Sequence, residues 1–351
     1  MSKSRESTMN PKIFSLLLLL VVAQCFGQSP SRNVSKSGTS AATFLEIGVG
    51  ARATAMGGAF VSLANDATAL YWNIAGIAKT DRNEVLALHT SWLAGTSFDF
   101  VGLVLPIGEL GKFGVSVTAL NMDELQVRTV EKPEGTGEFF DANDLAIGVS
   151  FGKQLIDRFA IGFTAKYIQQ QIWHESASAF AIDFGTTFRT DLFGGMTIGA
   201  AITNFGSKMR LQGRDLRQFH RLDENKLGSN ERIPQNLDLD SWQLPLNFQF
   251  GVSTEIVRHE NYRWLIAVDA LHPSDNYESV NLGTEMSLRD FVFLRGGYQS
   301  LFLKEAEGGL SLGAGLKTNM LFSRTSAKID YAYQDRGRLE AVHVFAIGIE
   351  F

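Results

Sequence analysis

The 351-residue sequence is poor in features on which several classes of protein depend. It contains one cysteine, so a fold held together by internal disulfides is excluded. No run of 18 apolar residues follows residue 27, which excludes a helical membrane span there. The formal net charge is −5 and lysine and arginine form no run, which argues against a nucleic-acid partner. With 34 glycines, 26 phenylalanines and 7 prolines, the composition favours strands joined by tight turns.

The first 27 residues resemble a secretory signal peptide. A basic stretch precedes the apolar run "IFSLLLLLVVA", which is too short to span a membrane as a helix and typical of a signal sequence. Cleavage after Gly27 would leave a mature chain without cysteine. Cys25 could instead mark a lipoprotein, but Gln24 before it is a poor match to the small residue found there. We therefore predict a signal peptide over residues 1–27 and an exported protein.

The chain from residue 84 onward alternates between apolar and small or polar residues, the period-two pattern of β-strands. In "FAIGFTAKY" one face carries Phe159, Ile161, Phe163, Ala165 and Tyr167, and the other carries Ala160, Gly162, Thr164 and Lys166. A soluble sandwich alternates in the same way, but its polar face is rich in lysine and glutamate. Here that face is mostly glycine, alanine, serine and threonine. Strands of about 10 residues also match the apolar band of an outer membrane.

The fold class predicted for residues 83–351 is therefore all-β, an antiparallel transmembrane β-barrel of about 14 strands in the outer membrane. Short turns and long loops alternate along the chain, as periplasmic turns and external loops do in such barrels, with both termini periplasmic. The longer loops lie around residues 122–142, 205–245 and 299–307. The strands are expected near residues 84–93, 97–107, 112–121, 143–154, 158–171, 177–190, 195–204, 246–257, 262–271, 278–289, 291–299, 308–318, 325–335 and 339–351.

The C-terminal residues "HVFAIGIEF" form a last alternating strand. It resembles the signal recognised by the barrel assembly machinery of the outer membrane, so that machinery and outer-membrane lipid are expected partners. The residues that carry this signal share one face: Phe345, Ile347, Ile349 and Phe351.

The inward face of the predicted barrel carries four acidic and four basic residues, for which mutual pairing is the expected role and an ion-selective pore the alternative. These lumen charges are Lys166, Asp183, Asp269, Glu285, Arg295, Lys317, Lys328 and Asp330. Most other inward positions are small. A barrel of this width cannot be filled by such side chains, so another part of the chain or water must occupy it.

The stretch "ARATAMGGAFVSLANDATALYWNIAGIA", residues 51–78, supplies a candidate filling. It is rich in alanine and glycine and nearly uncharged, so a short helix there can pack closely against a glycine-rich wall. We predict that residues 28–82 form a helical hatch that folds into the lumen from the periplasmic side. An ordinary periplasmic surface helix is the alternative.

This stretch resembles the N-terminal hatch of FadL-type barrels, specifically that of the PorV/PorQ family. Ile74 stands where the family pattern usually has proline, which loosens the turn there. The resemblance implies a non-enzymatic component of type IX protein secretion that binds the C-terminal domains of exported cargo or attachment-complex proteins. The alternative that it implies is a FadL-like transporter of hydrophobic small molecules. The residues that fit the family's hatch motif are Gly50, Ala51, Arg52, Met56, Gly57, Ala59, Phe60, Ala64, Asp66, Ala69, Asn73, Ala75 and Gly76.

The sequence contains no pattern typical of catalysis or metal binding. Its six histidines are scattered, and no serine lies in a recognisable nucleophile motif. We therefore predict neither an enzyme nor a metal or other cofactor. The basic part of the 205–245 loop, which includes Arg210, Arg214, Arg217 and Arg221, could contact a partner protein or lipopolysaccharide, or could be a solvated loop.

Overall fold

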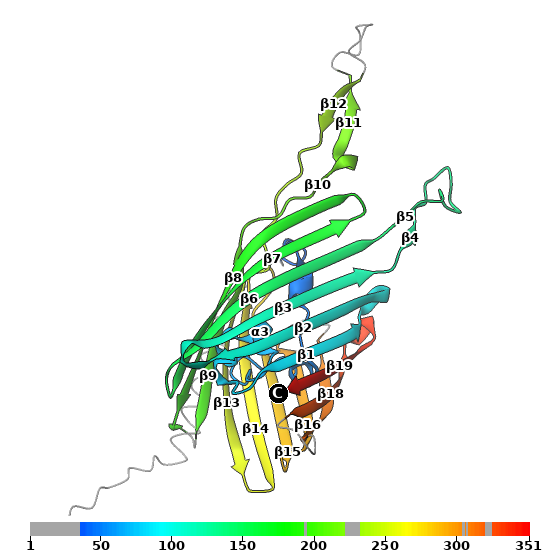
Figure 1. The fold of residues 1–351 in the computed structure, drawn as a ribbon. Helices are drawn as coiled ribbons and strands as arrows, with labels where there is room; N and C mark the ends of the chain where they lie inside the picture. The colour runs from blue at the N-terminus through cyan, green and yellow to red at the C-terminus, as the bar shows by residue number, and fades with distance from the viewer. Residues whose placement is uncertain (1–35, 193–194, 222–231, 304–305, 307, 320–324) are drawn as a thin grey trace, which may run out of the picture. The chain divides into compact units, whose positions relative to one another are not determined.

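Fourteen long strands form a closed antiparallel barrel in the computed structural model (Figure 1). Each strand pairs with the next along the chain, and the last pairs with the first, which closes the barrel. The structure describes residues 36–192, 195–221, 232–303, 306, 308–319 and 325–351, so the predicted signal peptide lies outside the described residues. The strands are β1 (Glu84–Ser91), β2 (Thr96–Ile107), β3 (Gly111–Met122), β6 (Ala142–Ile156), β7 (Phe159–Ile172), β8 (Glu175–Thr190), β9 (Met196–Gly206), β13 (Asn247–Arg258), β14 (Tyr262–Pro273), β15 (Ser279–Leu288), β16 (Val292–Leu301), β17 (Leu310–Asn319), β18 (Ser326–Asp335) and β19 (Ala341–Glu350).

The predicted fold class is confirmed, and each predicted strand end lies within 2 residues of the observed one. The alternation of residue types also matches the faces of the wall. On β7, Phe163 is 46% exposed on the outside whereas Thr164 is 1% exposed on the inside. An apolar outer face of this kind is what a strand in contact with lipid requires.

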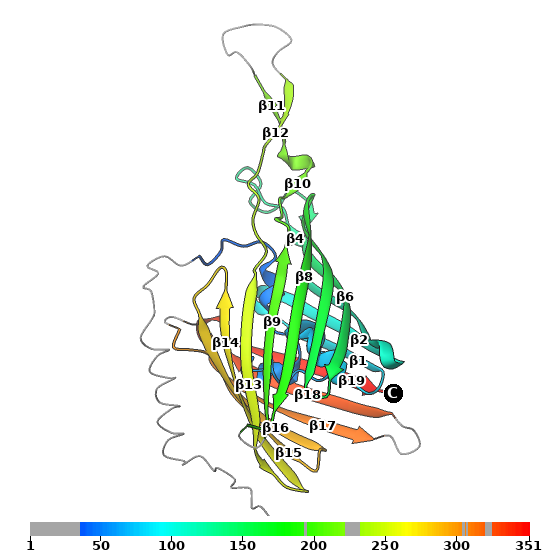
Figure 2. The same ribbon diagram turned by 90° about the vertical axis from the view of Figure 1, so that its left-hand side faces the viewer.

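The two ends of the barrel differ in the length of their connections. The loop end carries the connections β1–β2, β3–β6, β7–β8, β9–β13, β14–β15, β16–β17 and β18–β19, and the turn end carries the others. Figure 2 shows strand hairpins projecting from the loop end. The sequence did not predict these short strands, because runs of two to four residues carry too little alternation. They are β4 (Leu125–Gln126), β5 (Phe139–Phe140), β10 (Gln212–Gly213), β11 (Arg217–His220) and β12 (Ile233–Asn236).

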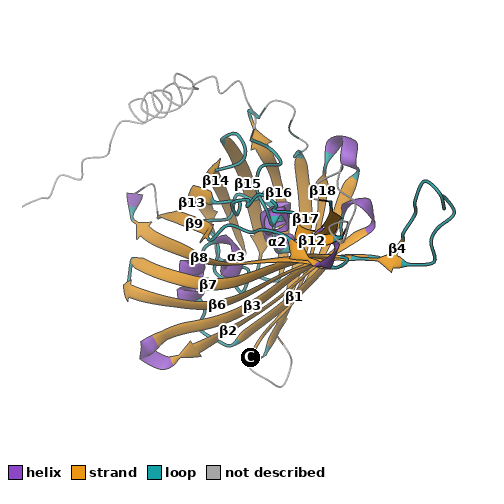
Figure 3. Cartoon of the chain, turned by 90° about the horizontal axis from the view of Figure 1, so that it is seen from above, coloured by secondary structure: helices purple, strands orange, loops and turns teal. Residues whose placement is uncertain are grey.

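Residues 37–83, which we call the inner segment, lie inside the barrel (Figure 3). The segment contains η1 (Thr43–Glu46), α2 (Ala51–Ala55), α3 (Ala69–Trp72) and η2 (Ile74–Lys79). α2 contacts β16 to β19, whereas η2 contacts β3 and β6 to β8 on the opposite wall. The segment therefore spans the interior from wall to wall. In the described parts of the connections lie the short helices η3 (Leu93–Gly95), η4 (Gly108–Leu110), η6 (Arg214–Leu216) and η7 (Gly337–Leu339).

The inner segment begins beside the loop end, not at the turn end as the sequence had suggested. The Ala41 amide donates to the carbonyl of Gln243 at 2.8 Å, and the Ala42 amide donates to Oε1 of Gln170 at 2.8 Å. Both acceptors lie at the loop end, and these bonds to residues remote in sequence set the point of entry. Phe351 lies at the turn end, where its amide donates to the carbonyl of Asn83 at 2.9 Å.

The glycines of the wall explain how the segment fits. A Cβ atom on Gly297 would lie 2.1 Å from the backbone of Met56, and one on Gly185 would lie 2.2 Å from Oδ1 of Asn73. Real Cβ atoms do not approach so closely, so only glycine allows the segment to reach the wall. The inward glycines that look like empty space in the sequence are contact positions.

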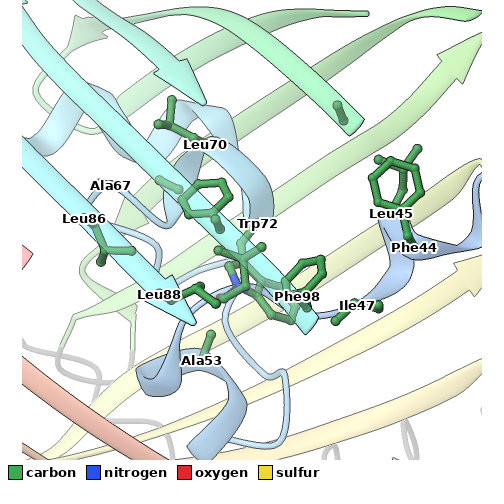
Figure 4. Close-up of a cluster of buried hydrophobic side chains, with 14 of the residues drawn as sticks. Phe44, Leu45, Ile47, Ala53, Ala67, Leu70, Trp72, Leu86, Leu88 and Phe98 are labelled. Carbon is green, nitrogen blue, oxygen red and sulfur yellow. Dashed lines mark hydrogen bonds between the residues drawn. The ribbon is translucent and has the colours of Figure 1, made fainter. Parts of the chain in front are cut away.

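The loop side of the interior is a continuous apolar core. Phe44 and Leu45 of η1 and Trp72 of α3 pack there with Leu88 and Phe98 of the wall (Figure 4). Phe44 and Phe98 are 2% and 1% exposed. Burial of such side chains contributes about 1.5–3 kcal/mol each, so the segment is held by its core before any charge is considered.

Candidate functional site

Arg52 in α2 is the main charged contact between the inner segment and the barrel wall. Its Nε and Nη2 donate to the two carboxylate oxygens of Glu285 on β15, at 2.8 and 3.1 Å. Its Nη1 donates to Oδ1 of Asn65 at 2.7 Å and lies 3.4 Å from Asp66. The guanidinium also lies 5.1 Å from the ring centre of Phe60. A bidentate pair of this kind fixes orientation as well as distance.

The Arg52–Glu285 pair continues along the wall as an alternating chain of charges. Nε of Arg295 on β16 donates to Glu285 at 2.7 Å, and its Nη1 donates to Asp330 on β18 at 2.5 Å. The side chains of Glu285 and Arg295 are 0% and 3% exposed. Each buried charge has an opposite charge on either side, which is what makes its burial tolerable. We call Asp66, Arg52, Glu285, Arg295 and Asp330 the ion-pair chain.

Neighbouring charges of the segment and the wall keep Asp66 and Arg52 ionised. Burial alone would raise the pKa of Asp66, but Lys328 and Arg52 and the hydrogen bonds from Thr68 hold it below its ordinary value. Burial likewise opposes the charge of Arg52, yet Glu285 and Asp66 raise the pKa of its guanidinium. Arg52 and Asp66 are therefore both charged at neutral pH.

Two further polar residues hold the turns of the segment. Asp269 on β14, 0% exposed, accepts hydrogen bonds from the backbone amides of Phe60 and Val61, at 2.7 and 2.8 Å. Asn73 donates to the carbonyl of Val61 at 2.8 Å and to that of Thr186 on β8 at 3.0 Å. Buried side chains thus form hydrogen bonds with backbone groups that lie outside the helices of the segment and have no partner there.

The remaining predicted lumen charges face inward but lie outside the ion-pair chain. Lys166 and Asp183 pair with each other at 2.8 Å on the loop side. Lys317 and Lys328 lie at the turn end, where both contact Glu350, at 2.9 and 2.6 Å. Lys328 also lies 3.5 Å from Glu84.

The predicted lumen charges did not include Glu84 and Glu350, although both stand near the ends of the strands predicted for residues 84–93 and 339–351. Extending the alternation to those ends would have placed both on the inner face. The prediction also missed Asn65 and Thr68, for which the sequence carries no signal.

The residues of the hatch motif lie in the middle of the inner segment, between residues 50 and 76. Every one of them is buried except Arg52, which is half-buried. Gly50 has φ of 93°, and a Cβ there would lie 2.6 Å from Thr68. Ile74, where the family pattern usually has proline, opens η2 and is 3% exposed. On β19, Phe345, Ile347 and Ile349 point outward, and Phe351 after the strand is 51% exposed.

A charged cavity of about 610 Å³ lies at the turn end, between the inner segment and the wall. Its lining includes four members of the ion-pair chain, all but Glu285, together with Lys79, Arg289 and Asp290. On the loop side, a pocket lined by Leu45, Tyr71 and other residues holds only about 20 Å³. The segment and its apolar core thus lie between this charged cavity and the loop end.

No three or more histidine, cysteine, aspartate or glutamate side chains in the part of the chain that the structure describes are placed to hold a metal ion. None of the helices described there is long and apolar enough to cross a membrane.

Comparison with known proteins places the chain among membrane barrels. A family model described as "Type IX secretion system protein PorV" matches residues 30–250. The toluene transporter TodX of Pseudomonas putida is 13% identical, with a TM-score of 0.55, over 86% of this chain and 97% of that one. The toluene transporter TbuX of Ralstonia pickettii is 13% identical, with a TM-score of 0.53, over the same shares. At this identity the two structures show a shared fold alone. No curated protein matches the chain.

Proposed function

Since the chain belongs to the family of type IX secretion system protein PorV, an outer-membrane barrel, we propose that it is a non-enzymatic component of type IX secretion. In this proposal it binds exported cargo proteins, through their C-terminal domains, or proteins of the attachment complex. The observation that carries the proposal is the inner segment, which fills the barrel and is tied to its wall. What remains available to a large partner is the loop end with its projecting hairpins.

The proposal includes an orientation. Cleavage after Gly27 leaves residues 28–82 as a hatch ahead of the barrel of residues 83–351. The turn end, with Phe351, faces the periplasm, and the loop end faces outward. The short connections of the turn end and the long ones of the loop end support this direction.

The charges of the interior serve in this proposal to hold the hatch, not to select ions. Asp66, Arg52, Glu285, Arg295 and Asp330 each contact an opposite charge, which supports a structural role. An ion-selective pore instead needs charged side chains that passing ions can reach.

The β11–β12 hairpin is the first surface to test for partner binding. Phe219 in β11 is 65% exposed, and the guanidinium of Arg232 lies 5.8 Å from its ring centre. An isolated two-stranded hairpin is only marginally stable in water, and contact with a partner would stabilise it. Aromatic and arginine side chains are common at the centre of protein interfaces, so Phe219 and Arg232 suit such a contact. Phe139 on β5, 55% exposed on another loop, offers a matched control.

The experiment is purification of the tagged full-length protein from its own outer membrane in mild detergent, with mass spectrometry of what remains bound. Exported proteins that share a C-terminal β-domain are expected with the wild type and with Phe139→Ser, and much less of them with Phe219→Ser. A barrel that carries no protein would contradict the proposal. Equal recovery with both variants would refute the hairpin as the contact surface.

A FadL-like transporter of hydrophobic small molecules is the second candidate. The apolar core on the loop side of the segment favours it, because an apolar molecule could replace part of that packing. The same purification separates the two functions: a lone barrel that retains apolar molecules in native mass spectra would support transport.

A further inference from the structure

The connection between β9 and β13 carries the β11–β12 hairpin and holds the start of the inner segment at its base (Figure 2). At this base Gln243 forms a parallel bridge with Ser40, and its carbonyl accepts a hydrogen bond from the Ala41 amide at 2.8 Å. The residue before it, Trp242, forms an antiparallel bridge with Met209, in which each amide donates to the other's carbonyl at 2.8 Å. The start of the inner segment is therefore the edge of a small sheet of three chain segments.

A series of contacts joins this base to the hairpin. Next to the hairpin, the Leu237 amide donates to the carbonyl of Leu216 at 2.9 Å. Closer to the base, Nη1 of Arg210 donates to Oδ1 of Asp238 at 2.7 Å. The two legs of the connection are thus tied to each other from the hairpin down to the Met209–Trp242 bridge, so a displacement of the hairpin can reach the inner segment.

The base of the connection is packed inside the barrel with the inner segment. Met209 and Leu244 are 2% and 3% exposed and belong to the same apolar core as Phe44 of η1. The base cannot move outward without exposing this apolar surface and breaking the bond to Ala41. The connection therefore has a packed arrangement that holds the segment, and any withdrawn arrangement releases it.

Other contacts of the segment's start go to the barrel wall and to a different connection. The Ala42 amide donates to Oε1 of Gln170 on β7, and the Ser40 hydroxyl donates to Oδ2 of Asp275 between β14 and β15. Withdrawal of the β9–β13 connection thus removes only part of the hold on the segment, and its effect is expected to be moderate.

We propose that the β9–β13 connection is a latch: a partner protein bound to the β11–β12 hairpin draws its base away from Ser40 and Ala41, and so frees the start of the inner segment. This inference rests on the proposed function, which assigns that hairpin to exported cargo or attachment-complex proteins. Coupling between two sites is reciprocal, so a segment fastened to the connection must weaken partner binding, typically about 5–150-fold.

A reversible chemical bridge between two introduced cysteines tests the latch. The only cysteine of the sequence, Cys25, lies in the predicted signal peptide. Full-length protein carrying Ser40→Cys and Gln243→Cys is stripped of bound proteins, bridged with a short bifunctional methanethiosulfonate, and mixed again with the proteins it had retained. The bridged form is expected to recover about tenfold less of them than the same protein after reduction.

The matched control bridges the two legs of the connection without touching the inner segment. Arg210 and Asp238 are in contact, with side chains 45% and 88% exposed, so cysteines there are accessible to the reagent. Arg210→Cys with Asp238→Cys is expected to recover the same amount of partner before and after reduction.

A second measurement needs no partner. Ala41→Pro removes the amide that donates to Gln243, whereas Ala41→Ser keeps it. Hydrogen exchange of residues 240–246 is expected to be about fivefold faster in Ala41→Pro than in Ala41→Ser, the effect of one hydrogen bond. Peptides of β4 and β5, on another connection, should exchange equally in both.

Equal recovery by the bridged and reduced forms of the Ser40–Gln243 pair would overturn the latch, and so would equal exchange of residues 240–246 in the two Ala41 variants. A wild type that retains no protein would overturn the proposed function and, with it, release by a partner. The exchange measurement would still show in that case whether the connection holds the segment.

Discussion

Replacing Arg52 with alanine is expected to release the inner segment while leaving the barrel wall intact. The change removes the bidentate bond to Glu285 and the contacts with Asn65 and Asp66. The wall keeps its own ladder of hydrogen bonds between strands, so the lost stability is local to residues 37–83.

The size of the destabilisation follows from the burial of Glu285, the partner that Arg52 leaves behind. The side chain of Glu285 is 0% exposed, and removing one partner of a buried pair costs about 3–5 kcal/mol. Arg295 still contacts Glu285 at 2.7 Å, so we expect the lower limit, about 3 kcal/mol. Since each 1.4 kcal/mol is tenfold, the released population of the segment rises about 100-fold.

Hydrogen exchange followed by mass spectrometry measures this release peptide by peptide. In Arg52→Ala, peptides from residues 51–79 are expected to exchange faster, while peptides of β7 and β14 keep wild-type protection. Arg158→Ala is the matched control, since its pair with Asp191 is exposed at 57% and 80% and contributes less than about 1 kcal/mol. Adding Glu285→Gln to Arg52→Ala should recover part of the protection, because the buried side chain that lost its Arg52 partner then carries no charge.

Peptides from residues 51–79 that exchange no faster in Arg52→Ala than in Arg158→Ala would refute the release of the segment. Faster exchange across the whole barrel would also contradict it, because the segment and the wall would then be one cooperative unit.

Three further changes test the other contacts of the segment. Asp269→Ala leaves two buried backbone amides without an acceptor, which costs about 1–3 kcal/mol each. Hydrogen exchange at residues 60–61 should therefore rise, and it should rise less in Asp269→Asn, whose side chain keeps an acceptor oxygen. Gly297→Ala places a Cβ 2.1 Å from the segment's backbone, whereas at Gly296 the nearest atom is 3.6 Å away; only the first should increase protease cleavage of residues 37–83. The lowered pKa of Asp66 stabilises the packed segment above the carboxyl's unfolded pKa of about 3.9, and that stability is lost as pH falls through the lower, folded value. An acid titration of tryptophan fluorescence should show this loss in the wild type, and Asp66→Asn should flatten it.

The sequence predicted the barrel well because alternation is a local property that the wall repeats in every strand. Each inward or outward position on β7, such as Thr164 and Phe163, depends only on its neighbours in the chain. The same logic placed Glu285, Arg295 and Asp330 on the inner face, but it could not bring them together. Their contacts depend on strand register and on the position of Arg52, about 230 residues away in the chain.

The path of the inner segment could not be predicted either. The glycine and alanine content indicates close packing, but the direction of entry depends on hydrogen bonds to Gln170 and Gln243, which lie far along the chain. Asp269 illustrates the same limit, because its type suggests an ion pair whereas its described partners are backbone amides.

Ion current through the protein in a planar lipid bilayer tests the central claim most directly, namely that the inner segment closes the barrel. The account predicts no steady conductance for the wild type, and openings in Arg52→Ala as the segment leaves its site. A wild-type barrel that conducts steadily, with Arg52→Ala indistinguishable from it, would contradict the account.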